Sequence, residues 1–302
     1  MWKRRNLCRI RRIAQHTSII GVDLGGTKIA LCRYDAETWA QEECSRIPTH
    51  ADRTFRHVLN DLVNAVEQLR GENTVAVGIG VPGLVQQPEG MILTLPNIPG
   101  AEHMNMRAQM AERLKLPVNV DNDANCFTLA EALHGAGKGH DIVVGITMGT
   151  GVGGGIVLNG KLYHGSHGYA AEIGHMLLMP GQPPFETDDR RGDTEQFLSG
   201  SALKKRCQAA ENPSQYFTGE TCSFLHPELF REISWLCVNL IHTIDPSIVV
   251  LGGSAGHALK PHSKSIKNEL LKWLLPGTPL PVIAFGELEE AATLGAALLM
   301  QQ

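Results

Sequence analysis

The chain has 302 residues, of which 43% are hydrophobic, 19% charged and 5% aromatic, and its formal net charge is −4. This is the composition of an ordinary globular protein, long enough for two domains or one large one. The negative charge and the scarcity of aromatics argue against nucleic acid as a partner. No run of 18 apolar residues occurs, so we expect no membrane partner either.

The first twelve residues are strongly basic and contain no acidic side chain; the cations are Lys3, Arg4, Arg5, Arg9, Arg11 and Arg12. This leader has neither the apolar core of a secretory signal nor a small-residue cleavage site. A nucleic-acid arm and an organelle presequence stay open as alternatives. We expect residues 1–17 to be a disordered extension of the folded protein.

The seven cysteines form no CxxC pair and are odd in number. Disulfides are rare in reducing compartments, and metal sites usually show paired spacings. The cysteines are therefore interpreted as reduced, partly buried thiols of a cytoplasmic protein.

In chain order, an apolar strand is predicted at residues 18–23, a second at 29–34, a one-faced helix at 55–69 and a buried strand at 75–81. A β-rich run at 117–120 leads into an alanine-rich helix. Strands at 141–147 and 156–158, a helix at 229–244 ended by Asp245-Pro246, a strand at 248–251 and a helix at 291–300 follow.

Both halves open with a strand, a glycine-rich turn and a second strand, which is a weak internal repeat. Alternating strands and helices predict an α/β protein in two lobes. The expected divisions are residues 18–121 for the N-terminal lobe, 122–290 for the C-terminal lobe and 291–302 for a helix that packs back on the first lobe.

Residues 120–125 read Val-Asp-Asn-Asp-Ala-Asn, at the point where the β-rich run becomes a helix. A carboxylate or carboxamide there can cap the unpaired N–H groups of the helix. A carboxylate at the end of a strand can also take a proton from a substrate hydroxyl. Alone, this segment favours a simple cap, but the glycine turns elsewhere favour the catalytic interpretation for Asp123.

The two glycine turns have the residue types of a phosphate site. Glycine allows close backbone approach, and its N–H groups can line a concave anion site. Asp23 offers an oxygen ligand for Mg²⁺, while Thr27 and Lys28 add a hydroxyl and a positive charge. Residues 149–154 also fit the dinucleotide fingerprint, but a hairpin-like segment follows where a helix is needed, and no GxxxxGK[ST] motif occurs.

Five motifs together resemble the ROK family of bacterial sugar kinases and sugar-responsive repressors: DLGGTK at 23–28, GIGVPG at 78–83, DNDAN at 121–125, GTGVGGG at 149–155 and EIGH at 172–175. The resemblance covers residues 19 to the C-terminus and is strongest to the N-acetylglucosamine kinase branch. It implies the actin-like, hexokinase-like ATPase fold, with two lobes and a central cleft.

The resemblance also implies the site residues. Asp123 is the expected general base, and Asp23 the expected organiser of Mg²⁺. ATP contacts are expected from Gly25, Gly26, Thr27, Lys28, Gly149, Thr150, Gly151, Gly252 and Gly253. Sugar contacts are expected from Gly83, Asn97, Asn122, Glu172, His175 and Glu195.

One departure from the family concerns its structural zinc site, which uses a histidine and three cysteines. His175 is present, but the cysteine positions hold Glu186, Asp188 and Asp193. Because structural zinc prefers sulfur and nitrogen, we expect no zinc and an ion-paired loop involving Arg190 and Arg191, with His175 free for sugar contact. Calcium or magnesium in this loop is the alternative.

Two smaller expectations concern the segment before this loop. Ala171 stands where the family commonly has glycine, a change to which we attach little weight. His164 and His167, close in sequence to Glu172, are expected at the surface.

The leading hypothesis is an ATP-dependent kinase of a hexose or N-acetylhexosamine, with N-acetyl-D-glucosamine and its 6-hydroxyl preferred. Glucokinase, fructokinase and N-acetylmannosamine kinase activities are alternatives, as is a non-catalytic sugar-binding protein. A repressor is disfavoured because few residues precede the first strand. The resemblance further implies a homodimer.

Overall fold

The computed structural model describes residues 16–96, 98–211 and 213–302. The predicted leader, apart from its last two residues, and Cys8 lie outside the described residues. Within the described part of the chain, no helix is long and apolar enough to cross a lipid bilayer.

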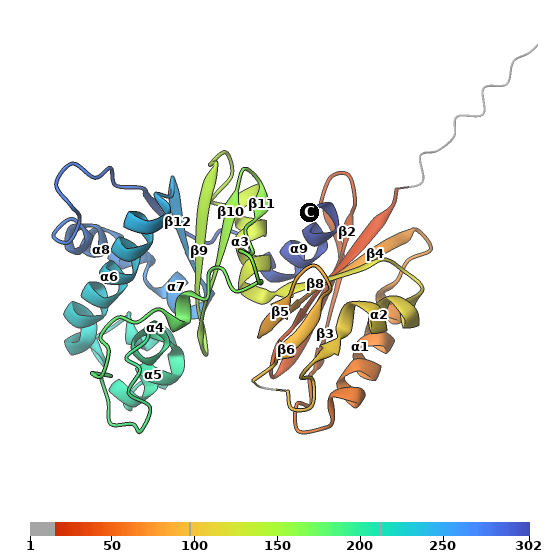
Figure 1. Cartoon of the computed structure of the whole chain (residues 1–302), viewed down its shortest axis with the longest axis horizontal. Helices are drawn as coiled ribbons and strands as arrows, with labels where there is room; N and C mark the ends of the chain where they lie inside the picture. The colour runs from red at the N-terminus through yellow and green to blue at the C-terminus, as the bar shows by residue number, and fades with distance from the viewer. Residues whose placement is uncertain (1–15, 97, 212) are drawn as a thin grey trace, which may run out of the picture.

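Two five-stranded sheets form the frame of the molecule (Figure 1). The first has the order β3-β2-β1-β4-β8 and consists of β1 (Ser18–Leu24), β2 (Lys28–Asp35), β3 (Gln41–Pro48), β4 (Thr74–Val81) and β8 (Val118–Asn122). The second has the order β11-β10-β9-β12-β13 and consists of β9 (Ile142–Met148), β10 (Val152–Leu158), β11 (Lys161–Leu162), β12 (Ile248–Gly252) and β13 (Val282–Phe285).

The two sheets share one topology, which confirms the repeat predicted from the sequence. In each, a central strand pairs antiparallel with the next strand of its hairpin and parallel with a later strand, which pairs parallel with the edge strand. The carboxyl ends of parallel neighbours meet at the same edge of a sheet, where α/β proteins bind their ligands. A small third sheet comprises β5 (Leu84–Gln86), β6 (Met91–Thr94) and β7 (Met104–Asn105).

Helices cover both faces of each sheet (Figure 1). One core joins the first sheet to α1 (Phe55–Leu69) and α2 (Met106–Leu114), and another joins the second sheet to α6 (His226–Ile244) and α8 (Ser263–Leu270). The remaining core lies between the sheets and contains α3 (Asp123–His134) and α9 (Ala291–Leu298). Alternate strand residues serve opposite faces, as the pleat requires. Shorter helices on the second lobe are α4 (Thr194–Leu198), α5 (Gly200–Arg206) and α7 (Gly253–Ala258).

Helix α9 lies directly on the backbone of β1 and β4. A Cβ atom at Gly21 would lie 1.8 Å from the carbonyl oxygen of Thr293, and one at Gly78 would lie 1.7 Å from that of Ala296. No larger residue fits at either position without displacing the helix. These glycines therefore set the distance between α9 and the first sheet.

Helix α9 also contacts α3 closely, because a Cβ atom at Gly295 would lie 1.7 Å from the carbonyl oxygen of Cys126. The buried carboxylate of Glu131 in α3 accepts hydrogen bonds from the N–H groups of Glu287 (2.9 Å) and Leu288 (3.0 Å), just before α9. A buried charge of this kind is costly unless it is hydrogen-bonded. Glu131 thus holds the segment by which the chain returns to the first lobe.

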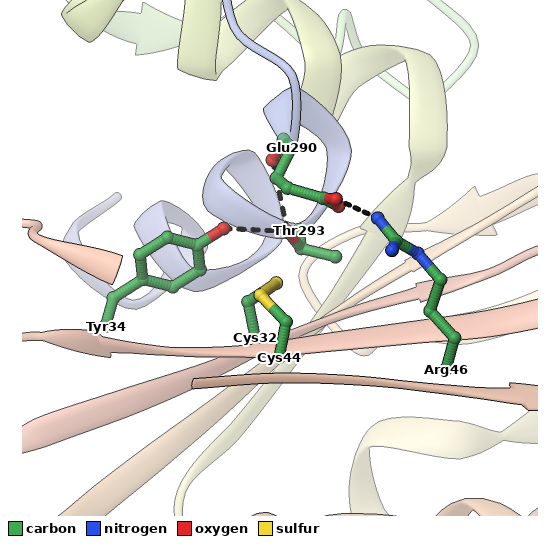
Figure 2. The surroundings of a disulfide bond; sticks show 6 residues. All are labelled: Cys32, Tyr34, Cys44, Arg46, Glu290 and Thr293. Carbon is green, nitrogen blue, oxygen red and sulfur yellow. Dashed lines mark hydrogen bonds and ion pairs between the residues drawn. A yellow bond between two sulfur atoms is a disulfide. The ribbon is translucent and has the colours of Figure 1, made fainter. Parts of the chain in front are cut away.

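Side chains of β2 and β3 complete the contact with α9 (Figure 2). The hydroxyl groups of Tyr34 and Thr293 are hydrogen-bonded at 2.7 Å, and Arg46 forms an ion pair with Glu290, the residue before α9. Polar contacts therefore supplement the close backbone packing at the start of the helix.

The prediction that all cysteines are reduced is wrong for two pairs. Cys32 and Cys44 lie directly opposite each other on β2 and β3 and form a disulfide (Figure 2), and Cys207 forms a second with Cys222. Strand register and loop folding bring together cysteines whose spacing in sequence resembles no known pair motif. Among the described cysteines, two are free and buried, Cys126 and Cys237.

The second glycine turn is shorter than predicted, because β10 begins at Val152 and takes in the glycines at 153–155. These glycines serve packing. A Cβ atom at Gly153 would lie 2.8 Å from the Cβ of Ala124, and one at Gly155 would lie 2.4 Å from the hydroxyl of Thr128. Glycine in β10 therefore allows α3 to lie close on the second sheet.

We predict that Gly78→Ala lowers the free energy of unfolding by about 3 kcal/mol or more, because overpacking against a backbone carbonyl cannot be relieved by a side-chain rotation. Gly71→Ala is the matched control, since its Cβ would make only ordinary contacts of 3.7–3.8 Å with Arg33. Urea unfolding of both variants measures the difference. Equal stabilities would show that α9 does not depend on this contact.

Candidate active site

The first sheet places two carboxylates at one edge. In the parallel register, Asp23 of β1 pairs with Gly80 of β4, and Gly80 pairs with Asp121 of β8. All three residues lie near the carboxyl ends of their strands. Asp23 therefore leads into the first glycine turn beside the point where β8 leads into α3.

At the β8–α3 junction, the neighbouring residues Asn122 and Asp123 make different contacts. The side-chain oxygen of Asn122 caps α3 by accepting from the N–H groups of Ala124 (2.8 Å) and Asn125 (3.3 Å), and its amide donates to the carbonyl of Gly83 (3.1 Å). Asp123 is the first residue of the helix, and within the described part of the chain only one of its oxygens accepts a hydrogen bond, from the Ala124 N–H at 2.9 Å. The cap is thus Asn122, which leaves Asp123 available for chemistry.

Burial and mutual repulsion change the acidity of these carboxyl groups. Burial, together with the charges of Asp23 and Glu172, raises the pKa of Asp123 to about 7. Burial raises the pKa of Asp23 to about 6, an effect that Lys28 opposes and Glu290 reinforces. Asp23, Asp123 and Glu172 therefore lie within electrostatic reach of one another, and Asp123 changes its protonation state near neutral pH.

The first glycine turn follows Asp23 and is tightly hydrogen-bonded. The N–H of Gly25 donates to the carbonyl of Lys28 at 3.0 Å, and the hydroxyl of Thr49 donates to the carbonyl of Gly25 at 2.6 Å. Thr27 and Lys28 are exposed. The turn therefore presents a hydroxyl, an ammonium group and the backbone of Gly26 beside the Asp23 carboxylate.

The second glycine turn, residues 149–151, stands at the corresponding edge of the other sheet. The N–H of Gly149 donates to the carbonyl of Gly151 at 3.0 Å, and the N–H of Gly200 at the start of α5 donates to the carbonyl of Gly149 at 2.8 Å. Gly253 has φ +76°, and a Cβ there would lie 2.4 Å from the carbonyl of Met148. Residues 252 and 253 thus lie against the strand end that leads into the turn.

Three of the residues expected to bind sugar are brought together. Burial raises the pKa of Glu172, while His175 lowers it and Glu195 raises it, so both side chains lie within electrostatic reach of Glu172. One oxygen of Glu195 accepts the N–H of Val152 at 3.0 Å, which ties it to the second glycine turn. Asn97 lies outside the described residues.

The loop that replaces the zinc site is held partly by ion pairs. Arg191 lies 2.7 Å from Asp189 and 3.6 Å from Asp193. Glu186 and Asp188 are exposed, and nowhere in the described chain do three His, Cys, Asp or Glu side chains gather as a metal-ligand group.

His175 was predicted to be free for sugar contact alone, and this prediction is wrong. Its Nδ1 lies 3.3 Å from an oxygen of Asp193, a carboxylate that is buried and also caps α4. The imidazole therefore retains only Nε2 for a ligand.

The prediction for His164 is also wrong, whereas His167 is exposed as expected. His164 is partly buried, and its Nε2 lies 2.6 Å from an oxygen of Asp121. The two residues are far apart in sequence, and no local motif signals their contact.

The ROK family model matches residues 19–302 of the chain. The chain belongs to the ROK family. The N-acetyl-D-glucosamine kinase of Erwinia tasmaniensis is 35% identical over 256 residues, which cover 77% of this chain and 82% of that protein. The N-acetyl-D-glucosamine kinase of an Escherichia coli O139:H28 strain is 32% identical over 283 residues, covering 87% and 92%.

Solved ROK structures have the same fold. The ROK hexokinase of Thermus thermophilus superposes with a TM-score of 0.78 at 31% identity, covering 93% of this chain and 97% of that one. The ROK glucokinase of Streptomyces griseus, solved with glucose and AMPPNP, superposes with a TM-score of 0.76 at 31% identity, covering 94% and 100%. The actin-like, hexokinase-like fold predicted from the motifs is therefore confirmed.

Within the ROK family, Ala171 is a more consequential departure than the sequence suggested. Its φ of +67° lies in the left-handed region, where a residue other than glycine is strained. Glu172 follows immediately. The backbone that presents this carboxylate is therefore under strain that glycine would not have.

We predict that Ala171→Gly stabilises the protein by up to about 1 kcal/mol, because relief of about 1–2 kcal/mol exceeds the added entropy of the unfolded chain. Ala170→Gly is the control and should destabilise by about 0.4–1 kcal/mol, since Ala170 is not among the residues with positive φ. Thermal unfolding measures both. A loss of stability in both variants would contradict the predicted strain.

Proposed function

We propose that this chain is an ATP-dependent sugar kinase that transfers the γ-phosphoryl group of Mg·ATP to a hexose or N-acetylhexosamine. The preferred substrate is N-acetyl-D-glucosamine, phosphorylated at the 6-hydroxyl. One observation carries the proposal. Asp123 is a carboxyl group at the first turn of a helix, not used as its cap, with its pKa raised to about 7 by burial and by Asp23 and Glu172.

Asp123 acts as the general base. Its carboxylate takes the proton of the sugar hydroxyl while the hydroxyl oxygen attacks the γ-phosphorus, and the bond from that phosphorus to the bridging oxygen of ADP breaks. Phosphoryl transfer depends mainly on positioning and charge neutralisation, so one base suffices. A base works best when its pKa lies near the operating pH, as it does for Asp123.

The chain's own groups fit Mg·ATP. The Asp23 carboxylate is an oxygen donor of the kind that Mg²⁺ prefers, and Lys28 adds a positive charge beside it. The N–H groups of Gly25 and Gly149 are used within their turns. We therefore expect other N–H groups of the two turns to bind the phosphate oxygens. Those of Gly26 and Thr150 are examples, because they donate to no backbone acceptor within the described residues.

The sugar site combines donors and acceptors. The carboxylate of Glu172 accepts hydrogen bonds from sugar hydroxyl groups, while the amide of Asn122 and Nε2 of His175 offer polar contacts. N-acetyl-D-glucosamine is the preferred substrate because relatives that are 32–35% identical bear the name N-acetyl-D-glucosamine kinase. Glucose, mannose, fructose and N-acetylmannosamine are the alternatives, since small changes in a pocket alter sugar preference. Cytoplasmic residence and a homodimer stay predictions.

ADP release tests the proposal. The protein is incubated with Mg·ATP and, in separate reactions, with N-acetylglucosamine, N-acetylmannosamine, glucose, mannose and fructose. We expect sugar-dependent ADP release, fastest with N-acetylglucosamine. Faster turnover of another sugar would correct the substrate alone. Binding of a sugar without ADP release from any would reject the kinase in favour of a non-catalytic sugar-binding protein.

We predict that Asp123→Asn lowers kcat by at least about 100-fold while the sugar dissociation constant stays within about threefold, because the amide keeps the shape but accepts no proton. In the unsubstituted protein, kcat/KM should be level above pH 7 and fall about tenfold per pH unit below it, since only the carboxylate acts as base.

Asp141→Asn, at an exposed carboxylate before β9, is the control and should leave turnover and the pH profile unchanged. Turnover of Asp123→Asn near that of the control would reject Asp123 as the base.

A further inference from the structure

The loop of residues 163–170, between β11 and Glu172, reaches from the second lobe to the first at two points. We propose that His164 in this loop is a positioning residue for phosphoryl transfer, which holds the β8–α3 junction through Asp121 when the lobes are together. The proposal rests on the proposed function, in which the base Asp123 belongs to that junction.

The first contact is the hydrogen bond of 2.6 Å between Nε2 of His164 and Oδ2 of Asp121. The side chain of Asp121 is only 5% exposed, and that of His164 is 26% exposed. The other oxygen of Asp121 accepts the N–H of Asn122 at 2.7 Å and the side-chain amide of Asn125 at 2.9 Å. Asp121 therefore connects His164 to residues on both sides of Asp123.

The second contact lies four residues along the loop. Gly168 has φ +87°, and a Cβ there would lie 2.8 Å from the carbonyl oxygen of Val85 in β5. The loop is closed on itself by a hydrogen bond of 3.1 Å from the N–H of Ala170 to the carbonyl of His164. Loop and first lobe are thus in direct contact, so the His164–Asp121 bond does not stand alone.

The loop continues directly into Ala171 and Glu172. It therefore links the carboxylate expected to bind the sugar with the junction that carries the base, whose strand β8 belongs to the first lobe. A displacement of about 1 Å in a reacting group can cost about 100-fold in rate. Loss of the His164 contact is expected to slow the chemical step more than it weakens binding of Mg·ATP, which contacts other turns.

Three variants test the role of His164 with the sugar that the wild-type protein phosphorylates. His164→Ala should lower kcat at least about tenfold with the KM for Mg·ATP within about twofold. His164→Gln should recover most of kcat, because its amide N–H can reach Asp121. His167→Ala, in the same loop and exposed, is the control and should match the wild type.

Hydrogen exchange provides a readout that does not need activity. In His164→Ala, the amide N–H of Asn122 should exchange faster than in wild type, with a melting temperature close to that of His167→Ala. If the wild type phosphorylates none of the sugars, the proposed function fails while exchange still decides whether His164 holds the junction. Unchanged exchange in His164→Ala, unchanged kcat in an active enzyme, or no recovery in His164→Gln would each overturn the positioning role.

Discussion

Close contact between α9 and the backbones of β1 and β4 is the constraint on which the arrangement of the two lobes depends. Gly21 and Gly78 allow α9 to pack closely on the first sheet, and Gly295 allows it to pack closely on α3. Because α3 begins with Asp123 and packs on the second sheet through the glycines of β10, the proposed base is fixed relative to both sheets. Small residues at these positions thus determine where the proposed base lies.

The acidic residues of the site act as a group. Asp23 and Glu172 both raise the pKa of Asp123, so the protonation state of Asp123 depends on their charges. Neutralisation of Asp23 by a bound cation would lower the pKa of Asp123 and favour the carboxylate that accepts a proton. In the proposed kinase, proton transfer to Asp123 would therefore become more favourable as Mg·ATP binds.

Much of the frame could be predicted because it depends on local patterns. Apolar periodicity placed the helix at 55–69, and the paired strand–turn–strand segments indicated the repeated topology. At 121–125, cap preferences alone favoured a simple helix cap, and the glycine turns elsewhere in the chain pointed to Asp123 as the base. What failed depends on contacts between distant segments. The Cys32–Cys44 pair follows from strand register, the His164–Asp121 bond from the approach of two lobes, and the length of β10 from the fit of α3.

The return of the chain over Glu131 to the first lobe has a consequence for synthesis on the ribosome. Strands β1 and β4 emerge early, yet the helix that covers their glycine-lined face lies far later in the chain. At about 5–20 residues per second, this face waits on the order of tens of seconds for α9. During that time apolar residues such as Ile19 and Ala76 lack their final neighbours. The first lobe therefore exposes part of its apolar surface until α9 has been synthesised.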